Sequence, residues 1–181
     1  MVYCKKATEE HHLSISFPEC LLGFNEIITR EGQRFSLFDT DWIVLDLDEV
    51  EKKLKQRERR EYQHKTCDFT SGIKITNATK MLLVECRLNY INANNLKSDE
   101  ISGKISGSEF IMGYTPPIHS TVYFLFTDKV KRLASRKLRE MRSNKKEYKA
   151  ATISDLKADF ATDCSSECRN NRCQYYPIQT A

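Results

Sequence analysis

The segment Lys80–Tyr90 limits most strongly what this chain can fold into. Its hydrophobic residues recur at every second position, namely Leu82, Val84, Cys86 and Leu88. A period of two predicts a strand with two different faces. The second face carries Glu85 and Arg87, and buried charges are costly unless they are paired or bind a metal. These two side chains are therefore expected to face a cleft or to pair with other charges; a surface ion pair on an exposed strand face is the alternative.

The preceding segment, Cys67–Thr76, also has the character of a strand, and the turn-like residues after it predict an antiparallel hairpin. We place Asn77-Ala78 at the tip of this hairpin. That turn puts Asp68 opposite Arg87, with Glu85 on the same face. A slip of one residue would move one set of side chains to the other face, so the expectation depends on the turn.

An acid on one strand, followed by acid-x-base on the next, resembles the PD-(D/E)xK nuclease superfamily, which has the restriction-endonuclease-like fold. The matching residues are Cys67-Asp68-Phe69 and Val84-Glu85-Cys86-Arg87-Leu88. The order of elements in that family is helix, strands, helix, strand, helix, and residues 48–143 are expected to follow it.

The resemblance implies that Asp68 and Glu85 hold a divalent metal, Mg²⁺ or Mn²⁺. It also implies that Arg87 helps to stabilise the developing charge. One departure stands out, because the basic residue of the family is normally Lys. Arg87 stays charged and can contact a phosphate, but it cannot act as a general base.

A helix is expected from Ser98 to about Met112, and Lys104 lies about 60 degrees from its apolar stripe by helical geometry. Some members of the resembled family supply the catalytic Lys from this helix. The resemblance therefore makes Lys104 a second candidate for the basic role; an ordinary surface Lys is the alternative.

Acids near the preceding helix are further candidates. The charged segment 49–63 predicts a helix, and a first-helix acid often joins the metal site in the resembled family, which points to Glu58 or Glu61; a solvated helix face is the alternative. Asp46 and Asp48 alternate with leucines just before it. They are expected to cap this helix, with a metal-binding edge as the alternative.

The segment 129–149 holds ten Lys or Arg and two Glu around an apolar stripe. This pattern predicts a basic amphipathic helix, which suits nucleic-acid phosphates. The candidate phosphate contacts are Lys131, Arg132, Arg136 and Arg139. A solvated face or a contact for an acidic protein partner remains open. Just before it, the nearly continuous apolar run at 121–127 predicts a strand buried on both faces that joins the sheet in parallel.

The whole chain, of 181 residues with 40% hydrophobic and 30% charged residues, suits a globular α/β protein with a small mixed sheet flanked by helices. We expect an N-terminal extension packing on the core (1–47), a nuclease-like core (48–150) and a loosely ordered Cys-containing tail (151–181). The sequence shows neither an apolar run long enough for a membrane span nor a secretory signal. Seven Cys, two of them in expected strands, favour a reduced, cytoplasmic protein.

Cysteines in the tail lack the spacing of a zinc knuckle, so no structural zinc is expected there; they are Cys164, Cys168 and Cys173. The expected function is metal-dependent cleavage of phosphodiester bonds, with DNA as the substrate. The resemblance also suggests a partner subunit, as in small nuclease-like proteins of prokaryotic defence systems. The alternative, which Arg87 favours, is a nuclease-like subunit without catalysis that binds nucleic acid or serves as a scaffold.

Overall fold

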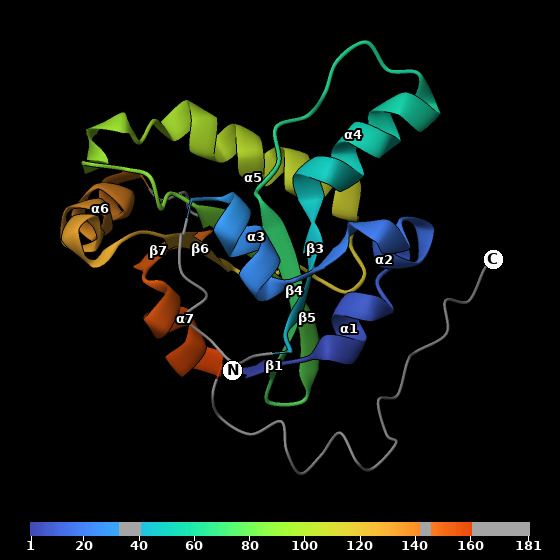
Figure 1. Cartoon of the computed structure of the whole chain (residues 1–181), viewed down its shortest axis with the longest axis horizontal. Helices are drawn as coiled ribbons and strands as arrows, with labels where there is room; N and C mark the ends of the chain where they lie inside the picture. Colours follow the sequence, from blue (N-terminus) through green and yellow to red (C-terminus); the bar gives the residue numbers. More distant parts are fainter. Residues whose placement is uncertain (33–40, 142–145, 161–181) are drawn as a thin grey trace.

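A single mixed sheet forms the centre of the molecule in a computed structural model that describes residues 1–32, 41–141 and 146–160 (Figure 1). Its strands are β1 (Val2–Tyr3), β2 (Leu21–Gly23), β3 (Ile43–Asp46), β4 (Phe69–Ile75), β5 (Ala78–Cys86), β6 (Thr121–Leu125) and β7 (Glu147–Ala151). The order is β2-β3-β4-β5-β6-β7, and β1 pairs with β4 beyond the end of β3. The pairs from β2 to β5 are antiparallel, and β5, β6 and β7 are parallel. The expected mixed sheet flanked by helices is confirmed.

Helices cover both faces of this sheet. They are α1 (Lys5–Glu9), α2 (His12–Ser16), α3 (Phe24–Arg30), α4 (Leu47–Glu58), α5 (Ser98–Met112), α6 (Asp128–Met141) and α7 (Ile153–Phe160), with 3-10 turns at Pro18–Cys20 and Ala93–Asn95. The apolar residues of α4, α5 and α6 pack in one core cluster with Leu83 and Phe124. Those of α3 and α7 pack in a second cluster with Leu82 and Val84. Because neighbouring strand residues point to opposite faces, the two clusters lie on the two sides of the sheet.

The parallel half of the sheet explains where α5 and α6 lie. Parallel neighbours require a crossover connection, and α5 connects β5 to β6 while α6 connects β6 to β7. Strand β6 is central among the parallel strands, and the side chains of Val122 to Leu125 are buried. The prediction of a doubly buried parallel strand at this position is therefore confirmed.

The β4–β5 hairpin differs from the expected register by two residues. Its tip is Thr76-Asn77, because Ile75 pairs with Ala78, and the left-handed backbone (φ +54°) falls on Thr76. Phe69 therefore pairs with Val84, which leaves Asp68 next to Glu85 instead of Arg87. Since side chains alternate with a period of two, this shift keeps the acids on the face that the sequence predicts.

Two helices end earlier in the structure than the sequence predicts. The first ends at Glu58 because Arg59 adopts a left-handed conformation (φ +53°) at its C-cap. The basic helix, expected to continue to residue 149, ends at Met141, and strand β7 begins at Glu147 instead. Parallel pairing with β6 outweighs the helical pattern there.

Both flanking regions contribute to the core. Residues 1–47 supply β1, β2 and β3 to the same sheet. Residues 153–160, expected to be loosely ordered, form α7, whose start is fixed by hydrogen bonds between Thr152 and Asp155. The three tail cysteines lie outside the described residues. No helix in the described ranges is long and apolar enough to cross a membrane.

Candidate active site

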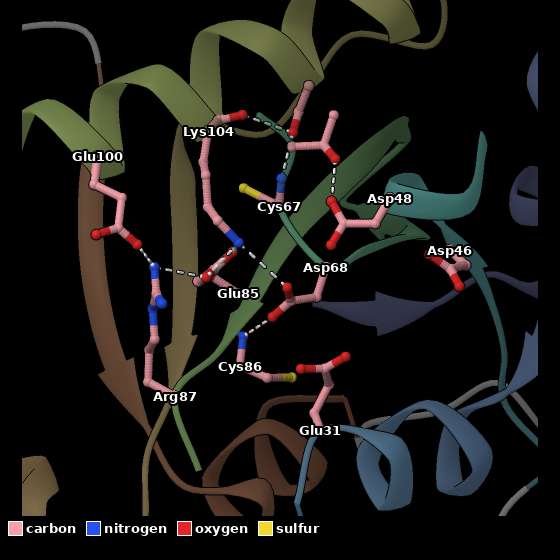
Figure 2. A network of polar contacts seen from close by, with 12 residues as sticks. Glu31, Asp46, Asp48, Cys67, Asp68, Glu85, Cys86, Arg87, Glu100 and Lys104 are labelled. Carbon is pink, nitrogen blue, oxygen red and sulfur yellow. Dashed lines mark hydrogen bonds and ion pairs between the residues drawn. The ribbon is translucent and has the colours of Figure 1, made fainter. Parts of the chain in front are cut away.

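Two strands and one helix bring Asp68, Glu85 and Lys104 together (Figure 2). Asp68 directly precedes β4, Glu85 is near the end of β5, and Lys104 lies on α5. The Nζ atom of Lys104 lies 2.8 Å from Oε1 of Glu85 and 3.4 Å from Oδ1 of Asp68. Both carboxylates therefore contact one ammonium group, as their common face in the sequence predicts.

Helix α5 is held over the strands by contacts beside Lys104. The backbone N–H of Cys67 donates to Oγ of Ser108 (2.8 Å), and this hydroxyl donates to the carbonyl of Lys104 (2.9 Å). Gly107 makes the approach possible, because a Cβ there would lie 2.0 Å from the carbonyl oxygen of Lys65. The position of the Lys104 side chain is thus fixed by the packing of its helix.

The carboxylate of Glu85 is buried in an unfavourable environment. Burial, and then the nearby charge of Asp68, raise its pKa to about 8, although Lys104 and Arg87 act in the opposite direction. Its Oε1 atom is buried and makes no hydrogen bond of good geometry, although Nζ of Lys104 and a guanidinium nitrogen of Arg87 lie within 2.9 Å. An acidic oxygen that is close to cations but poorly hydrogen-bonded is typical of a functional site.

The positive charge of Lys104 is stabilised by this surrounding. Desolvation alone would lower the pKa of its amino group, but Glu85 and Asp68 outweigh that effect and raise it. Lys104 is therefore an ammonium ion at neutral pH. It can stabilise negative charge but is unsuited to accept a proton.

Arg87 lies on the other side of Glu85, away from Asp68 (Figure 2). One guanidinium nitrogen contacts both Glu85 (2.9 Å) and Glu100 of α5 (2.6 Å), and the group stacks over the ring of Tyr90. Its Nε is buried without a hydrogen-bond partner among the described residues. These contacts tie β5 to α5 and hold the carboxylate of Glu85 in place.

Further acids approach Asp68 from the side opposite Lys104. Asp48 accepts a hydrogen bond from the hydroxyl of Thr66, and burial raises the pKa of its carboxyl. Glu31 points toward Asp68 (Figure 2), and burial followed by the charge of Asp68 raises its pKa. Asp46 instead caps α4 through Glu49 N–H, as predicted.

The acids expected on the first helix do not reach this site. Glu58 pairs with Arg60, and Glu61 lies exposed beyond the end of α4. Asp48, in the first turn of the same helix, is the acid of α4 that lines the cleft with Lys104 and interacts electrostatically with Asp68. The alternation of acids and leucines at 45–48 is the sequence feature that points to Asp48. Its favoured interpretation is helix capping, with a metal-binding edge as the alternative. Glu31 follows α3 without any pattern that relates it to Asp68.

A cleft of about 480 Å³ opens onto Lys104 and Asp48. Its lining mixes both signs of charge: Arg30, Glu31, Asp46, Asp48, Glu49, Lys52, Gln63, His64, Lys65, Thr66 and Lys104. A polar ligand that enters it therefore meets the ammonium group that both Asp68 and Glu85 contact.

The basic residues of α6 lie outside this lining. Lys131 pairs with Asp155 (2.7 Å), and Nε of Arg139 donates to the carbonyl of Ser135. Arg132 and Arg136 are exposed. The amphipathic pattern of this helix is confirmed, because Val130, Ala134 and Leu138 form its buried face.

Comparisons with protein-family models, with curated proteins and with solved structures found no match for this chain. What the residues do is therefore inferred from their geometry.

Proposed function

We propose that this protein is a metal-dependent nuclease that cleaves phosphodiester bonds, with DNA as its substrate. The supporting observation is the shared contact of Asp68 and Glu85, from adjacent strands, with Lys104 beside a polar cleft. Hydrolysis of a phosphodiester needs ligands for a cation and a group that stabilises negative charge. The two carboxylates can supply the first and the ammonium group of Lys104 the second.

The order of elements supports a restriction-endonuclease-like core. Helix α4, strands β4 and β5, helix α5, strand β6 and helix α6 follow one another, with β4–β5 antiparallel and β5–β6 parallel. The acids lie at the open end of the hairpin, where the resembled motif has them. Strand β3, before α4, extends the sheet on the β4 side.

The acid pair fits Mg²⁺ or Mn²⁺. These ions prefer oxygen ligands, and Mg²⁺ is usually bound by one or two carboxylates together with waters and substrate phosphates. In the described part of the chain no three His, Cys, Asp or Glu side chains converge as a complete metal site, so Asp68 and Glu85 would supply only the protein's share. Oε1 of Glu85 has Lys104 and Arg87 close by but makes no hydrogen bond of good geometry with the described residues, so we assign the metal contact to this oxygen. Such an ion would lower the pKa of a bound water and polarise the phosphate.

The protein's own residues divide the remaining tasks. Lys104, whose ammonium reaches the cleft, neutralises charge on the phosphate. Arg87 acts as a positioning residue, because its guanidinium group is engaged by Glu85 and Glu100. This division accounts for the Arg at the usual Lys position, since Lys104 on α5 carries the catalytic charge.

Cleavage of a labelled oligonucleotide with and without Mg²⁺ tests the proposal. Asp68→Asn and Lys104→Met should each reduce the rate at least about 100-fold, whereas Glu58→Gln, an exposed acid paired with Arg60, should leave it unchanged. A wild-type protein that is inert with Mg²⁺ and Mn²⁺ on single- and double-stranded substrates would contradict the proposal.

Helix α6 is proposed as a phosphate-binding surface. Each phosphate contact contributes about 0.9 to the slope of log affinity against log salt. The double variant Arg132→Glu/Arg136→Glu should therefore weaken DNA binding and flatten that slope without unfolding the protein, because both side chains are exposed. Unchanged affinity would assign the helix to solvent or to a protein partner.

The second candidate is a nuclease-like subunit that binds nucleic acid or serves as a scaffold without catalysis. The observation in its favour is that Glu85 already has two cationic neighbours, Lys104 and Arg87. Under either function, the resemblance suggests a partner subunit that selects the target, as in prokaryotic defence complexes. Four buried free thiols, at Cys4, Cys20, Cys67 and Cys86, suit a reducing cytoplasm.

A further inference from the structure

An aromatic row borders the cleft on the side of α5. The ring of His64 lies between Tyr62 (centroids 5.2 Å apart) and Phe110 (4.5 Å). Tyr62 and Phe110 are 61% and 66% exposed, although aromatic side chains usually bury most of their surface. We call Tyr62, His64 and Phe110 the aromatic row.

The aromatic row is continuous with the cleft. His64, together with its neighbours Gln63 and Lys65, lines the cleft that contains Lys104. Phe110 and Lys104 lie on the same helix, and the rise of 1.5 Å per residue separates them by about 9 Å along its axis. The ring of Phe110 contacts His64, which lines the cleft, so a strand with a phosphate at Lys104 can bring a neighbouring base along the cleft to these rings.

The segment that carries Tyr62 and His64 is rigidly held. The buried carboxylate of Glu51 accepts two bonds from Arg60 (2.8 and 2.9 Å) and one from the backbone N–H of His64 (2.7 Å). The carbonyl of Lys65 packs against Gly107, where any larger residue would clash. A backbone segment that is already held in place loses little entropy when a ligand binds beside it.

The charge around the aromatic row suits a nucleic acid. Residues 57–65 contain Arg57, Arg59, Arg60 and Lys65 against Glu58 and Glu61; with Glu51, which binds Arg60, one net positive charge remains beside the rings. Exposed aromatic side chains next to basic ones form the sites on which unpaired bases stack while their phosphates are neutralised. A regular duplex offers no free base faces for such stacking.

We propose that the aromatic row binds an unpaired base of a single-stranded or locally opened nucleic acid next to the phosphate held at Lys104. This inference deepens the proposed nuclease function, but the binding step itself needs neither metal nor cleavage. It assigns single-stranded or opened DNA, in preference to closed duplex, as the substrate class.

Fluorescence anisotropy in EDTA tests the binding step on the full chain, with three labelled probes: a short oligothymidylate, an abasic strand of the same length and a closed duplex hairpin. Wild-type protein should bind the oligothymidylate about tenfold more tightly than the abasic strand, because stacking of one base is worth about 1–3 kcal/mol. Tyr62→Ala and Phe110→Ala should remove this preference, and Phe110→Trp should keep it.

The matched control is Tyr114→Ala, since Tyr114 is 95% exposed and makes no ring contact with the aromatic row in the described structure. It should bind all three probes as the wild type does. Equal wild-type affinity for the thymidylate and abasic strands would overturn the inference, as would Tyr62→Ala and Phe110→Ala variants that bind unchanged; the latter would assign the row to a protein partner.

Cleavage assays separate this inference from the proposed function. Base-dependent binding with no cleavage in Mg²⁺ would keep the aromatic row as a single-strand site and reject the nuclease. Cleavage that depends on Asp68 but is indifferent to Tyr62 and Phe110 would keep the nuclease and reject the row.

Discussion

Two buried glutamates, Glu51 and Glu85, show how differently the same side chain can be used in one fold. Glu51 is 0% exposed and Glu85 is 1% exposed, and each has an Arg beside it. Burial opposes ionisation of Glu51, but the hydrogen bonds from Arg60 and from His64 N–H outweigh it and lower its pKa. Burial and the charge of Asp68 instead raise the pKa of Glu85 to about 8.

Hydrogen-bond satisfaction, more than burial, separates the two sites. Both oxygens of Glu51 accept bonds of good geometry, whereas Oε1 of Glu85 accepts none from the described residues. A carboxylate with three of its roughly four lone-pair sites occupied stabilises its surroundings and has little capacity left for a ligand. An unsaturated one beside a second acid costs stability, and such a cost is typical of functional positions.

The largest expected effect concerns activity. Glu85→Gln removes a charged metal ligand and should reduce Mg²⁺-dependent cleavage about 1,000-fold, which corresponds to about 4 kcal/mol of transition-state stabilisation. The same change at Glu51 should leave the rate of the folded protein within about twofold, because its carboxylate is bound by Arg60 and His64 N–H and does not line the cleft. Initial rates with a labelled oligonucleotide, measured below the melting temperature of each variant, check both expectations. Comparable losses in the two variants would mean that the difference between the two glutamates is not functional.

For stability, Glu51→Gln should have the larger effect and Glu85→Gln the smaller one. Glu51→Gln leaves the largely buried guanidinium of Arg60 with only the exposed Glu58 as a charged acceptor and the N–H of His64 without one, and removing one member of a buried pair costs about 3 kcal/mol. Glu85→Gln relieves the repulsion with Asp68, so the metal-free protein should keep its stability within about 1 kcal/mol or gain. Urea unfolding in EDTA measures both. A loss of about 3 kcal/mol in Glu85→Gln, together with an inert wild type, would identify Glu85 as a structural partner and favour the scaffold.

The pH dependence of unfolding should also differ in sign. The folded pKa of Glu85 lies above its ordinary value of 4.5, so the folded state retains a proton that the unfolded chain releases. The contribution of Glu85 to stability therefore falls as the pH rises from about 5 to about 8, by at most about 1.4 kcal/mol per pH unit. The folded pKa of Glu51 is lowered, so its contribution is present above the ordinary pKa and is lost as the pH falls through the folded value. Urea midpoints measure both effects. The midpoint of Glu85→Gln should rise relative to that of the wild type as the pH becomes more alkaline. The deficit of Glu51→Gln relative to the wild type should shrink as the pH becomes more acidic. Parallel curves would contradict this assignment.

The pattern of the sequence was sufficient to predict the sheet around Glu85 but not the surroundings of Glu51. Alternation at 80–90 and the turn after Thr76 place Asp68 and Glu85 on one face, and the two-residue error in register did not matter because it preserves the face. The offset of Lys104 from the apolar stripe of α5 placed its amino group over the strands, as found. These are local features that repeat with the period of one element.

Contacts between segments that are distant in the sequence could not be predicted from periodicity. Glu51 follows Val50 and precedes Leu54 on the buried side of α4, a signal that the many charges of that helix obscured. Its partners Arg60 and His64 became visible only once the helix was known to end at Glu58. Glu31 and the aromatic row likewise depend on how separate segments meet, which no periodicity encodes.

The smallest expected effect is on stability, when Arg60 and Arg87 are each replaced by Lys. It distinguishes an ion pair that depends on the geometry of the guanidinium group from one that depends only on charge. Arg60 holds Glu51 with two parallel bonds, a geometry that Lys cannot reproduce, so Arg60→Lys should cost about 1–2 kcal/mol. Arg87 reaches Glu85 and Glu100 with a single nitrogen, and its buried Nε has no hydrogen-bond partner among the described residues, which already lowers the stability of the folded state. Arg87→Lys restores the residue type of the resembled motif and removes that unpaired donor, so stability should change by less than about 0.5 kcal/mol. Cleavage should persist, because Lys104 supplies the charge at the cleft. Paired urea titrations of the two variants give the comparison, and the Arg87→Lys protein is assayed for cleavage in parallel.

If Arg87→Lys reduced stability as much as Arg60→Lys, Glu85 would be held by guanidinium geometry, just as Glu51 is. The two buried glutamates would then both be structural, and the nuclease proposal would lose the asymmetry on which it depends.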